Sequence, residues 1–301
     1  MKQLFILFAV LVFTVSPLFA DWFDGTGLPV PPESCYPNSD FFLSDDLIQS
    51  NTIVGFYGKP GSPVMGILGR LPKDELADLL YSYVREYAKS KNGMGAIPAF
   101  YIIYGTCQPG GEIGYMPKRT VEAWIEYALS NKIVVVIDHQ IGKYEVEDAM
   151  NHILPYLKYP NVHLALDPEW RTEKPMQEIG SVSAEELNHA QDMMDGYMVS
   201  NRIMGRRMLV VHQFHYRMIR NIQKVRNGSE QIELVHCMDG FGPPSLKMGT
   251  WKLVMQATNL TTKGFKLFFR SDFPNSGYDD PILSPGQVLS LNTRPSLVIY
   301  Q

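Results

Sequence analysis

Short apolar runs recur along the chain with helix-like segments between them, and this alternation restricts the fold more than any other feature. Each run is five to seven residues long and apolar at nearly every position. Continuous apolar runs of this length are typical of strands buried on both faces, as in parallel sheets. The eight runs lie at 52–58, 98–104, 133–138, 162–166, 208–212, 232–236, 264–269 and 296–300.

The segments between the runs predict helices. Residues 72–90 place apolar side chains at a 3.6-residue period. Pro117 suits the first turn of a second helix, and Ser183 with Glu186 forms a capping box for another that reaches about Val199. Further helices are expected from about Val146 to Leu157, from Met218 to Val225 and from Leu246 to Ala257.

A closed (β/α)8 barrel has eight strands separated by helices, and the sequence predicts this number. An open doubly wound sheet is the competing fold, but Gly58-Lys59-Pro60-Gly61 after the first run lacks the spacing of a phosphate loop. We therefore predict an α/β fold with one TIM-type barrel domain at 51–301. The chain ends directly after the eighth run, so the final helix should be missing. We expect the segment from 30 to 50 to cover the seam between strands eight and one instead.

Residues 1–20 have the pattern of a secretory signal peptide. Lys2 precedes an apolar run from Leu4 to Phe13, and Ala20 is a small residue at a plausible cleavage site. This hydrophobic core is too short for an integral membrane span. Residues 21–50 form an N-terminal extension rich in Pro, Gly, Ser and Asp. We expect a secreted or periplasmic protein.

Charge and cysteine content exclude some functions. The chain has 27 Lys and Arg residues against 31 Asp and Glu residues, with no basic run, so nucleic acid is not an expected partner. The three cysteines are Cys35, Cys107 and Cys237. Their odd number allows at most one disulfide, and their spacing matches no zinc motif. Cys107 and Cys237 lie at the ends of predicted core strands and are expected to be buried thiols. No cofactor or bound metal is predicted.

Polar residues follow the strand runs, and in a barrel these strand ends meet on one face. The fourth run leads into Asp167-Pro168-Glu169-Trp170. Two carboxyls on alternate residues of an extended chain face the same space, which separates their pKa values and lets one donate a proton while the other stays charged. The candidate catalytic residues are Glu169, Asp167, Asp239 and Asp138. The candidate substrate-binding residues are Tyr57, His139, Gln140, Trp170, His212, Gln213, His236, Arg270, Asp272 and Tyr300.

Each candidate also has an ordinary structural explanation. Asp138 would cap the next helix, Asp272 would stabilise a turn, and His212 or His236 would bond to backbone carbonyls in the core. Such explanations suffice for single residues. They account less well for polar residues at the ends of seven consecutive strands, and this recurrence favours a site.

Two resemblances follow from these residues. Asp167-Pro168-Glu169-Trp170 resembles the Asp-x-Glu signature at strand four of chitinase-like and lysozyme-like barrel glycosidases, in which the Glu is the proton donor. Residues 237–242, Cys-Met-Asp-Gly-Phe-Gly, are loosely similar to the Met-x-x-Asp region of the chitinase-like group. The longer acidic run of chitinases is absent, because 162–166 contains no acid. The whole chain, especially 163–169 and 211–214, resembles exported bacterial TIM-barrel proteins of unassigned activity, which implies the same fold and compartment.

Three functions are compatible with this pattern. The first is an exported glycoside hydrolase that cleaves a poly- or oligosaccharide. In it Glu169 is the general acid, Asp167 raises the pKa of Glu169, and Asp239, Asp138 or Asp272 is the nucleophile, base or orienting group. The second is a metal- or histidine-dependent hydrolase or phosphodiesterase, and the third is a non-catalytic carbohydrate- or cell-wall-binding barrel. The ligands considered for the second function are His139, His212, His236 and Asp239.

Overall fold

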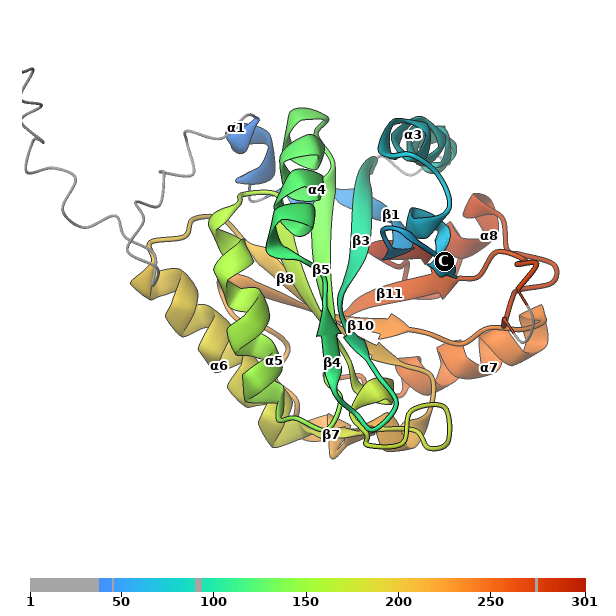
Figure 1. Cartoon of the computed structure of the whole chain (residues 1–301). Helices are drawn as coiled ribbons and strands as arrows, with labels where there is room; N and C mark the ends of the chain where they lie inside the picture. Colours follow the sequence, from blue (N-terminus) through green and yellow to red (C-terminus); the bar gives the residue numbers. More distant parts are fainter. Residues whose placement is uncertain (1–37, 45, 90–93, 274–275) are drawn as a thin grey trace, which may run out of the picture.

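The computed structural model describes residues 38–44, 46–89, 94–273 and 276–301, in which eight parallel strands close into a barrel (Figure 1). Each strand pairs with the next along the chain, and the last pairs with the first, which closes the ring. The predicted TIM-type barrel is confirmed. Its strands are β1 (Asn51–Lys59), β3 (Gly95–Cys107), β5 (Val134–Gln140), β6 (Val162–Asp167), β8 (Arg207–Gln213), β10 (Ile232–Met238), β11 (Thr262–Leu267) and β12 (Leu297–Tyr300).

The strands are apolar at successive positions because both of their faces are buried. Every residue of β5, for example, is buried. One face packs in the barrel interior, and the other lies under the surrounding helices, as Figure 1 shows for α4, α5 and α6. These helices are α3 (Lys73–Lys89), α4 (Lys118–Ser130), α5 (Val146–Ile153), α6 (Ala184–Ser200), α7 (Pro244–Met255) and α8 (Pro285–Leu289).

Short elements extend the carboxyl ends of the strands. Strands β2 (Ser62–Gly66) and β4 (Ile113–Tyr115) pair antiparallel with β1 and β3. Strands β7 (Val182–Ser183) and β9 (Ile219–Arg220) form a separate two-stranded sheet. The predicted capping box is confirmed: Ser183 Oγ accepts from the Glu186 N–H at 3.2 Å, and Glu186 Oε2 accepts from the Ser183 N–H at 2.7 Å.

The helix expected from Met218 to Val225 is wrong. That stretch contains two 3-10 turns, η6 (Tyr216–Met218) and η7 (Ile222–Lys224), with β9 between them. Asn221 has a φ of 55°, a left-handed conformation that interrupts a right-handed helix. Ile219 and Arg220 also pair with β7, so their backbone groups are committed to a sheet.

The segment at 30–50, predicted to cover the seam between strands eight and one, is described only at 38–44 and 46–50. Its described part, with α1 (Ser39–Phe42) and α2 (Asp46–Gln49), covers the amino-terminal end of the barrel. The Asn38 amide donates to the Leu129 carbonyl at 2.8 Å, and the Lys132 ammonium lies 5.8 Å from the Phe41 ring, just before β5.

Aromatic side chains fill the outer face of the seam between β12 and β1. Tyr83 of α3 packs on Tyr300 with ring centroids 4.8 Å apart, and the Tyr87 and Tyr300 hydroxyls lie 2.8 Å from each other. Phe269 stacks on Tyr300 at 5.3 Å. These contacts pack α3 and the residues after β11 against the seam.

Several predictions concern residues outside the described ranges, namely the signal peptide at 1–20, Cys35 and most of the extension at 21–50. Cys107 and Cys237 are free and buried, as expected. None of the helices in the described part of the chain is long and apolar enough to cross a membrane.

Candidate active site

Seven buried side chains meet inside the barrel near the carboxyl ends of the strands. Tyr57 of β1 contacts Asp138 of β5, and Tyr101 of β3 contacts His212 of β8. These strands are not neighbours in the sheet, so the contacts cross the barrel interior. We call this group the inner cluster. Its members are Tyr57, Tyr101, Asp138, Asp167, His212, Asp239 and Lys266.

An ion-paired carboxylate lies at the centre of the inner cluster. Asp239 Oδ2 is 3.0 Å from Lys266 Nζ and 2.9 Å from His212 Nδ1. The other ring nitrogen of His212 lies 2.7 Å from the Tyr101 hydroxyl. The Lys266 ammonium also lies 3.9 Å from the centroid of the Tyr57 ring, a cation–π contact. Asp239 is thus fixed by two cationic groups from two other strands.

These contacts keep the three groups charged despite their burial. Burial raises the pKa of Asp239, but Lys266 and His212 outweigh it and hold that pKa well below its ordinary value. Burial lowers the pKa of His212 and of Lys266, and Asp239 reverses both shifts, so each pKa lies above its usual value. The centre of the cluster is therefore an anion between two cations.

Asp138 and Asp167 behave in the opposite way. Burial raises the pKa of both carboxyls, and that of Asp167 rises well above the ordinary value, which favours their protonated forms. The Tyr57 hydroxyl donates to Asp138 Oδ2 at 2.8 Å, while Asp138 Oδ1 has no hydrogen-bond partner in the described part of the chain. Asp167 Oδ1 accepts from the Glu169 N–H at 3.3 Å and so begins the turn η5 (Pro168–Trp170).

Glu169 is half-buried where β6 opens into its loop. Burial, followed by the negative charge of Asp239 and opposed by Lys266, raises the pKa of Glu169 to about 7. A carboxyl with this pKa is protonated in a large fraction of molecules at neutral pH and can donate its proton. The sequence predicted one acid that donates a proton and a second acid that stays charged. Both kinds of acid are present, but the second one is not the predicted residue. Asp239 is the charged acid that acts on Glu169, whereas Asp167 is itself shifted upward.

Three predicted residues point away from the inner cluster. His139 lies beneath Tyr115, with ring centroids 5.6 Å apart, and burial lowers its pKa to about 3. His236 lies 2.7 Å from Gln213 Oε1, and burial, with the charge of Lys263, lowers its pKa to about 3 as well. They face outward because successive strand residues alternate, and Asp138 and His212 already point inward. His139, Gln213 and His236, predicted as substrate-binding residues, therefore lie outside the inner cluster.

Other predicted residues lie at the rim or elsewhere. Tyr300, also predicted as a substrate-binding residue, packs in the outer aromatic group and not in the inner cluster. Gln140 is buried at the rim, where its Oε1 accepts from the Cys107 N–H at 2.8 Å, and Trp170 is half-buried in η5. Arg270 and Asp272 are exposed in the loop after β11, and the Arg270 guanidinium lies 5.3 Å from the centroid of the Tyr278 ring.

A different acid is buried where Asp272 was expected to act. Asp279 Oδ2 lies 2.7 Å from Lys247 Nζ and accepts from the Phe268 N–H at 2.9 Å. Its Oδ1 accepts from the Gly242 N–H at 3.1 Å. Asp279 therefore ties together the loops that follow β10 and β11.

Sequence reasoning missed Tyr101 and Lys266, although both left a signal. Lys266 is a charged residue in the middle of the apolar run 264–269. A lysine at such a position requires either an acidic partner or a path to solvent. Tyr101 lies inside the run 98–104, where alternation alone would have assigned it to one face of the strand.

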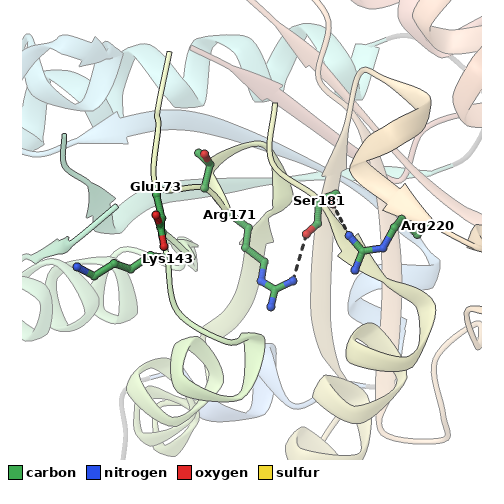
Figure 2. Close-up of a pocket in the computed structure, with 7 residues that line it drawn as sticks. Lys143, Arg171, Glu173, Ser181 and Arg220 are labelled. Carbon is green, nitrogen blue, oxygen red and sulfur yellow. Dashed lines mark hydrogen bonds between the residues drawn. The ribbon is translucent and has the colours of Figure 1, made fainter. Parts of the chain in front are cut away.

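A polar hollow of about 250 Å³ lies beside the site, between the loops that follow β5, β6 and β8 (Figure 2). Its walls include Lys143, Arg171, Glu173, Ser181 and Arg220. A second hollow, of about 730 Å³, is lined by residues such as Gln49 and Gly205. It lies at the amino-terminal end of the barrel, away from the inner cluster.

The proposed set of metal ligands is not assembled. His139 and His236 face the helices, whereas His212 and Asp239 face the interior. Within 38–44, 46–89, 94–273 and 276–301, no group of three or more His, Cys, Asp or Glu side chains is arranged to hold a metal ion. Of the four ligands considered, only His212 and Asp239 belong to one cluster.

Comparison with known proteins gives no match to a family model and none to a curated protein. Among solved structures, the chain is similar to the GH18 chitinase ChiB from Flavobacterium johnsoniae, with 9% identity and a TM-score of 0.44 over 83% of this chain and 86% of that one. It is also similar to a chitinase from Chromobacterium violaceum, with 8% identity and a TM-score of 0.39 over 72% and 68%. Both TM-scores are below 0.5, so the barrel assignment depends on the strand pairing described above.

Proposed function

We propose that the protein is an exported glycoside hydrolase that cleaves a poly- or oligosaccharide with Glu169 as its general acid. The observation that carries the proposal is the state of Glu169, half-buried at the end of β6 with a pKa raised to about 7. Glycosidases need one carboxyl that is still protonated at the working pH to protonate the leaving oxygen. Export is proposed from the signal-like residues 1–20.

The inner cluster supplies the other requirement of this reaction. Glycoside cleavage passes through a transition state with positive charge on the sugar ring. Asp239 is held as an anion by Lys266 and His212 and is close enough to raise the pKa of Glu169. In the proposed reaction, Glu169 donates its proton to the glycosidic oxygen as the bond between that oxygen and the anomeric carbon breaks, and the Asp239 carboxylate stabilises the positive charge. A water molecule then bonds to the anomeric carbon and gives up a proton, which restores the acid form of Glu169. Trp170 offers an indole face for a sugar ring.

The test is hydrolysis of a panel of saccharides that includes chitin, cellulose, xylan and bacterial cell-wall oligosaccharides. We expect the Glu169→Gln variant to lose about 10²- to 10⁴-fold in kcat, because the amide cannot donate the proton, while calorimetry still detects binding. Glu75→Gln, an exposed substitution on α3, is the control and should behave as the wild type. Wild-type activity should fall as pH rises through about 7, because Glu169 loses its proton there.

Two outcomes would reject the proposal. Full activity in Glu169→Gln would exclude this residue as the acid. Binding of a saccharide by the wild type without cleavage of any panel member would instead indicate a non-catalytic carbohydrate-binding barrel.

A further inference from the structure

The polar hollow beside the site is formed by the loop that carries Glu169. The Gly180 N–H donates to the Glu169 carbonyl at 2.7 Å, so the loop folds back on itself. A Cβ at Gly180 would lie 2.6 Å from the Pro168 carbonyl oxygen, which shows how closely the two segments approach. The Gly142 N–H also donates to the Trp170 carbonyl at 2.9 Å. Backbone bonds thus join Glu169 to Gly180, the neighbour of the wall residue Ser181, and join Trp170 to the wall residue Gly142.

Arg171 is a structural part of the wall. Its guanidinium pairs with Glu145 and, at 2.8 Å, with Glu186, and it donates to the Ser181 carbonyl at 3.3 Å (Figure 2). Its Nε also donates to the Tyr144 carbonyl at 3.3 Å. Most of its donors are therefore used to hold the loop in place.

The remaining walls have unused hydrogen-bonding capacity. Arg220 is half exposed, at 51%, and its guanidinium bonds to the Ser181 hydroxyl, leaving further N–H groups that face solvent. Lys143 pairs with Glu112 at 2.5 Å and keeps two more ammonium hydrogens. Glu173 is exposed and adds carboxylate acceptors. Donors and acceptors are therefore interspersed around the hollow, as Figure 2 shows.

We propose that this hollow is a subsite for one uncharged, hydroxyl-rich sugar ring of the saccharide, bound by Arg220, Ser181, Lys143 and Glu173. The proposal rests on the glycosidase function given above and adds the location at which one ring of the substrate binds. A volume of about 250 Å³ lies below the range of pockets for drug-sized ligands and suits a single small ring. Sugar hydroxyls both donate and accept, as the interspersed walls require.

The charge balance favours an uncharged ring over an anion. Three cationic side chains line the hollow, but Glu112, Glu145 and Glu186 already pair with them, and Glu173 adds a fourth acid. An anionic ligand would have to displace one of these carboxylates and would lie near the others. A hydroxyl group meets no such repulsion.

The test compares short and long substrates in Arg220→Met and Lys143→Met, which keep much of the side-chain length and remove the donors. We expect KM for the longest oligosaccharide that the wild type cleaves to rise about tenfold, with kcat and the KM of the shortest substrate unchanged. Arg85→Met, an exposed substitution on α3, is the matched control. Thermal unfolding of each variant checks that the loop is still folded.

Calorimetric titration of Glu169→Gln, with and without Arg220→Met, with the longest soluble oligosaccharide of the panel that the protein binds separates this subsite from the catalytic proposal. If no substrate is cleaved but Arg220→Met weakens binding, the subsite is supported and the glycosidase function fails. Equal KM changes for short and long substrates, or no change, would overturn the subsite. Tighter binding of an oligogalacturonate than of a neutral oligosaccharide would also overturn it, because the ligand class would then be anionic.

Discussion

Two sets of buried polar side chains lie on the same barrel strands but face opposite directions. The inward set, which includes Asp138 and His212, is linked across the barrel interior to tyrosines. The outward set begins one residue later on these strands, with His139 and Gln213, and packs under loops and helices. One step along a strand therefore separates a residue of the candidate site from a residue of the outer packing.

The two sets also differ in electrostatics. The inward cations are paired with an acid: burial lowers the pKa of His212, but Asp239 outweighs this effect and leaves that pKa above its ordinary value. His139 and His236 have no such acid, and burial lowers the pKa of each to about 3. Burial alone therefore does not mark a functional group in this barrel. The discriminating feature is an opposite charge on a different strand.

The largest expected difference between the two sets is on strand β11. Lys266 points inward to Asp239, whereas Lys263 points outward and donates to the Val254 and Ala257 carbonyls, each at 3.0 Å. We expect Lys266→Met to lower the free energy of unfolding by about 3 to 5 kcal/mol, because it removes one partner of a buried ion pair. Lys263→Met should cost only about 1 to 2 kcal/mol, since it removes hydrogen bonds to neutral carbonyls.

Urea denaturation of both variants at pH 7 measures this difference. Lys266→Met should also reduce saccharide hydrolysis, and Lys263→Met should not. Equal losses of stability would mean that Asp239 is adequately stabilised by His212 alone, and the contrast between the two faces would then disappear.

The barrel was predictable from the sequence, and the direction of its side chains was only partly so. Apolar runs such as 133–138 mark strands because a buried strand needs no polar face. Because side chains alternate along a strand, His139 faces outward where Asp138 faces inward. The predicted site nevertheless combined polar residues from both faces of the strands. Lys266 was missed because its acidic partner, Asp239, lies on a different strand, and no local pattern reports such a pair.

Loops and the N-terminal segment were less predictable for another reason. The stretch from Met218 to Val225 has enough apolar residues for a helix, but its pairing with β7 is a contact with a segment far away in the sequence. The position of α1 similarly depends on contacts with the ends of distant elements, such as the Leu129 carbonyl. Periodicity reports neither kind of contact.

A second prediction concerns the pH dependence of stability. His139 is buried and its pKa is lowered to about 3, so the unfolded chain binds a proton at this residue below about pH 6.5 while the folded protein does not. This residue should therefore cost about 1 kcal/mol of stability at pH 5.5 relative to pH 7.5. His139→Phe should remove that loss, as measured by the difference in unfolding free energy between the two pH values.

The inner histidine should show the opposite sign. The pKa of His212 is raised, so its contribution to stability is present below its ordinary pKa and is lost as pH rises through the raised value. His212→Phe should remove a decline of stability on the alkaline side, as measured by the unfolding free energy above neutral pH. If His139→Phe had no effect on the acid side, the folded protein would have to bind a proton at His139, contrary to its environment.

The smallest expected effect separates two buried tyrosine hydroxyls. Tyr300→Phe removes the 2.8 Å contact with the Tyr87 hydroxyl and should cost roughly 1 kcal/mol or less of stability without changing kcat/KM. Tyr57→Phe removes the donor to Asp138 at a similar cost, but it should also lower kcat/KM a few-fold, because Asp138 then loses its hydrogen-bond donor inside the cluster. Thermal unfolding and saccharide hydrolysis, measured on both variants, test the pair. Among the described residues, Tyr300 makes no contact with the inner cluster. An equal loss of activity in Tyr300→Phe and Tyr57→Phe would therefore show that the outer aromatic group controls the site.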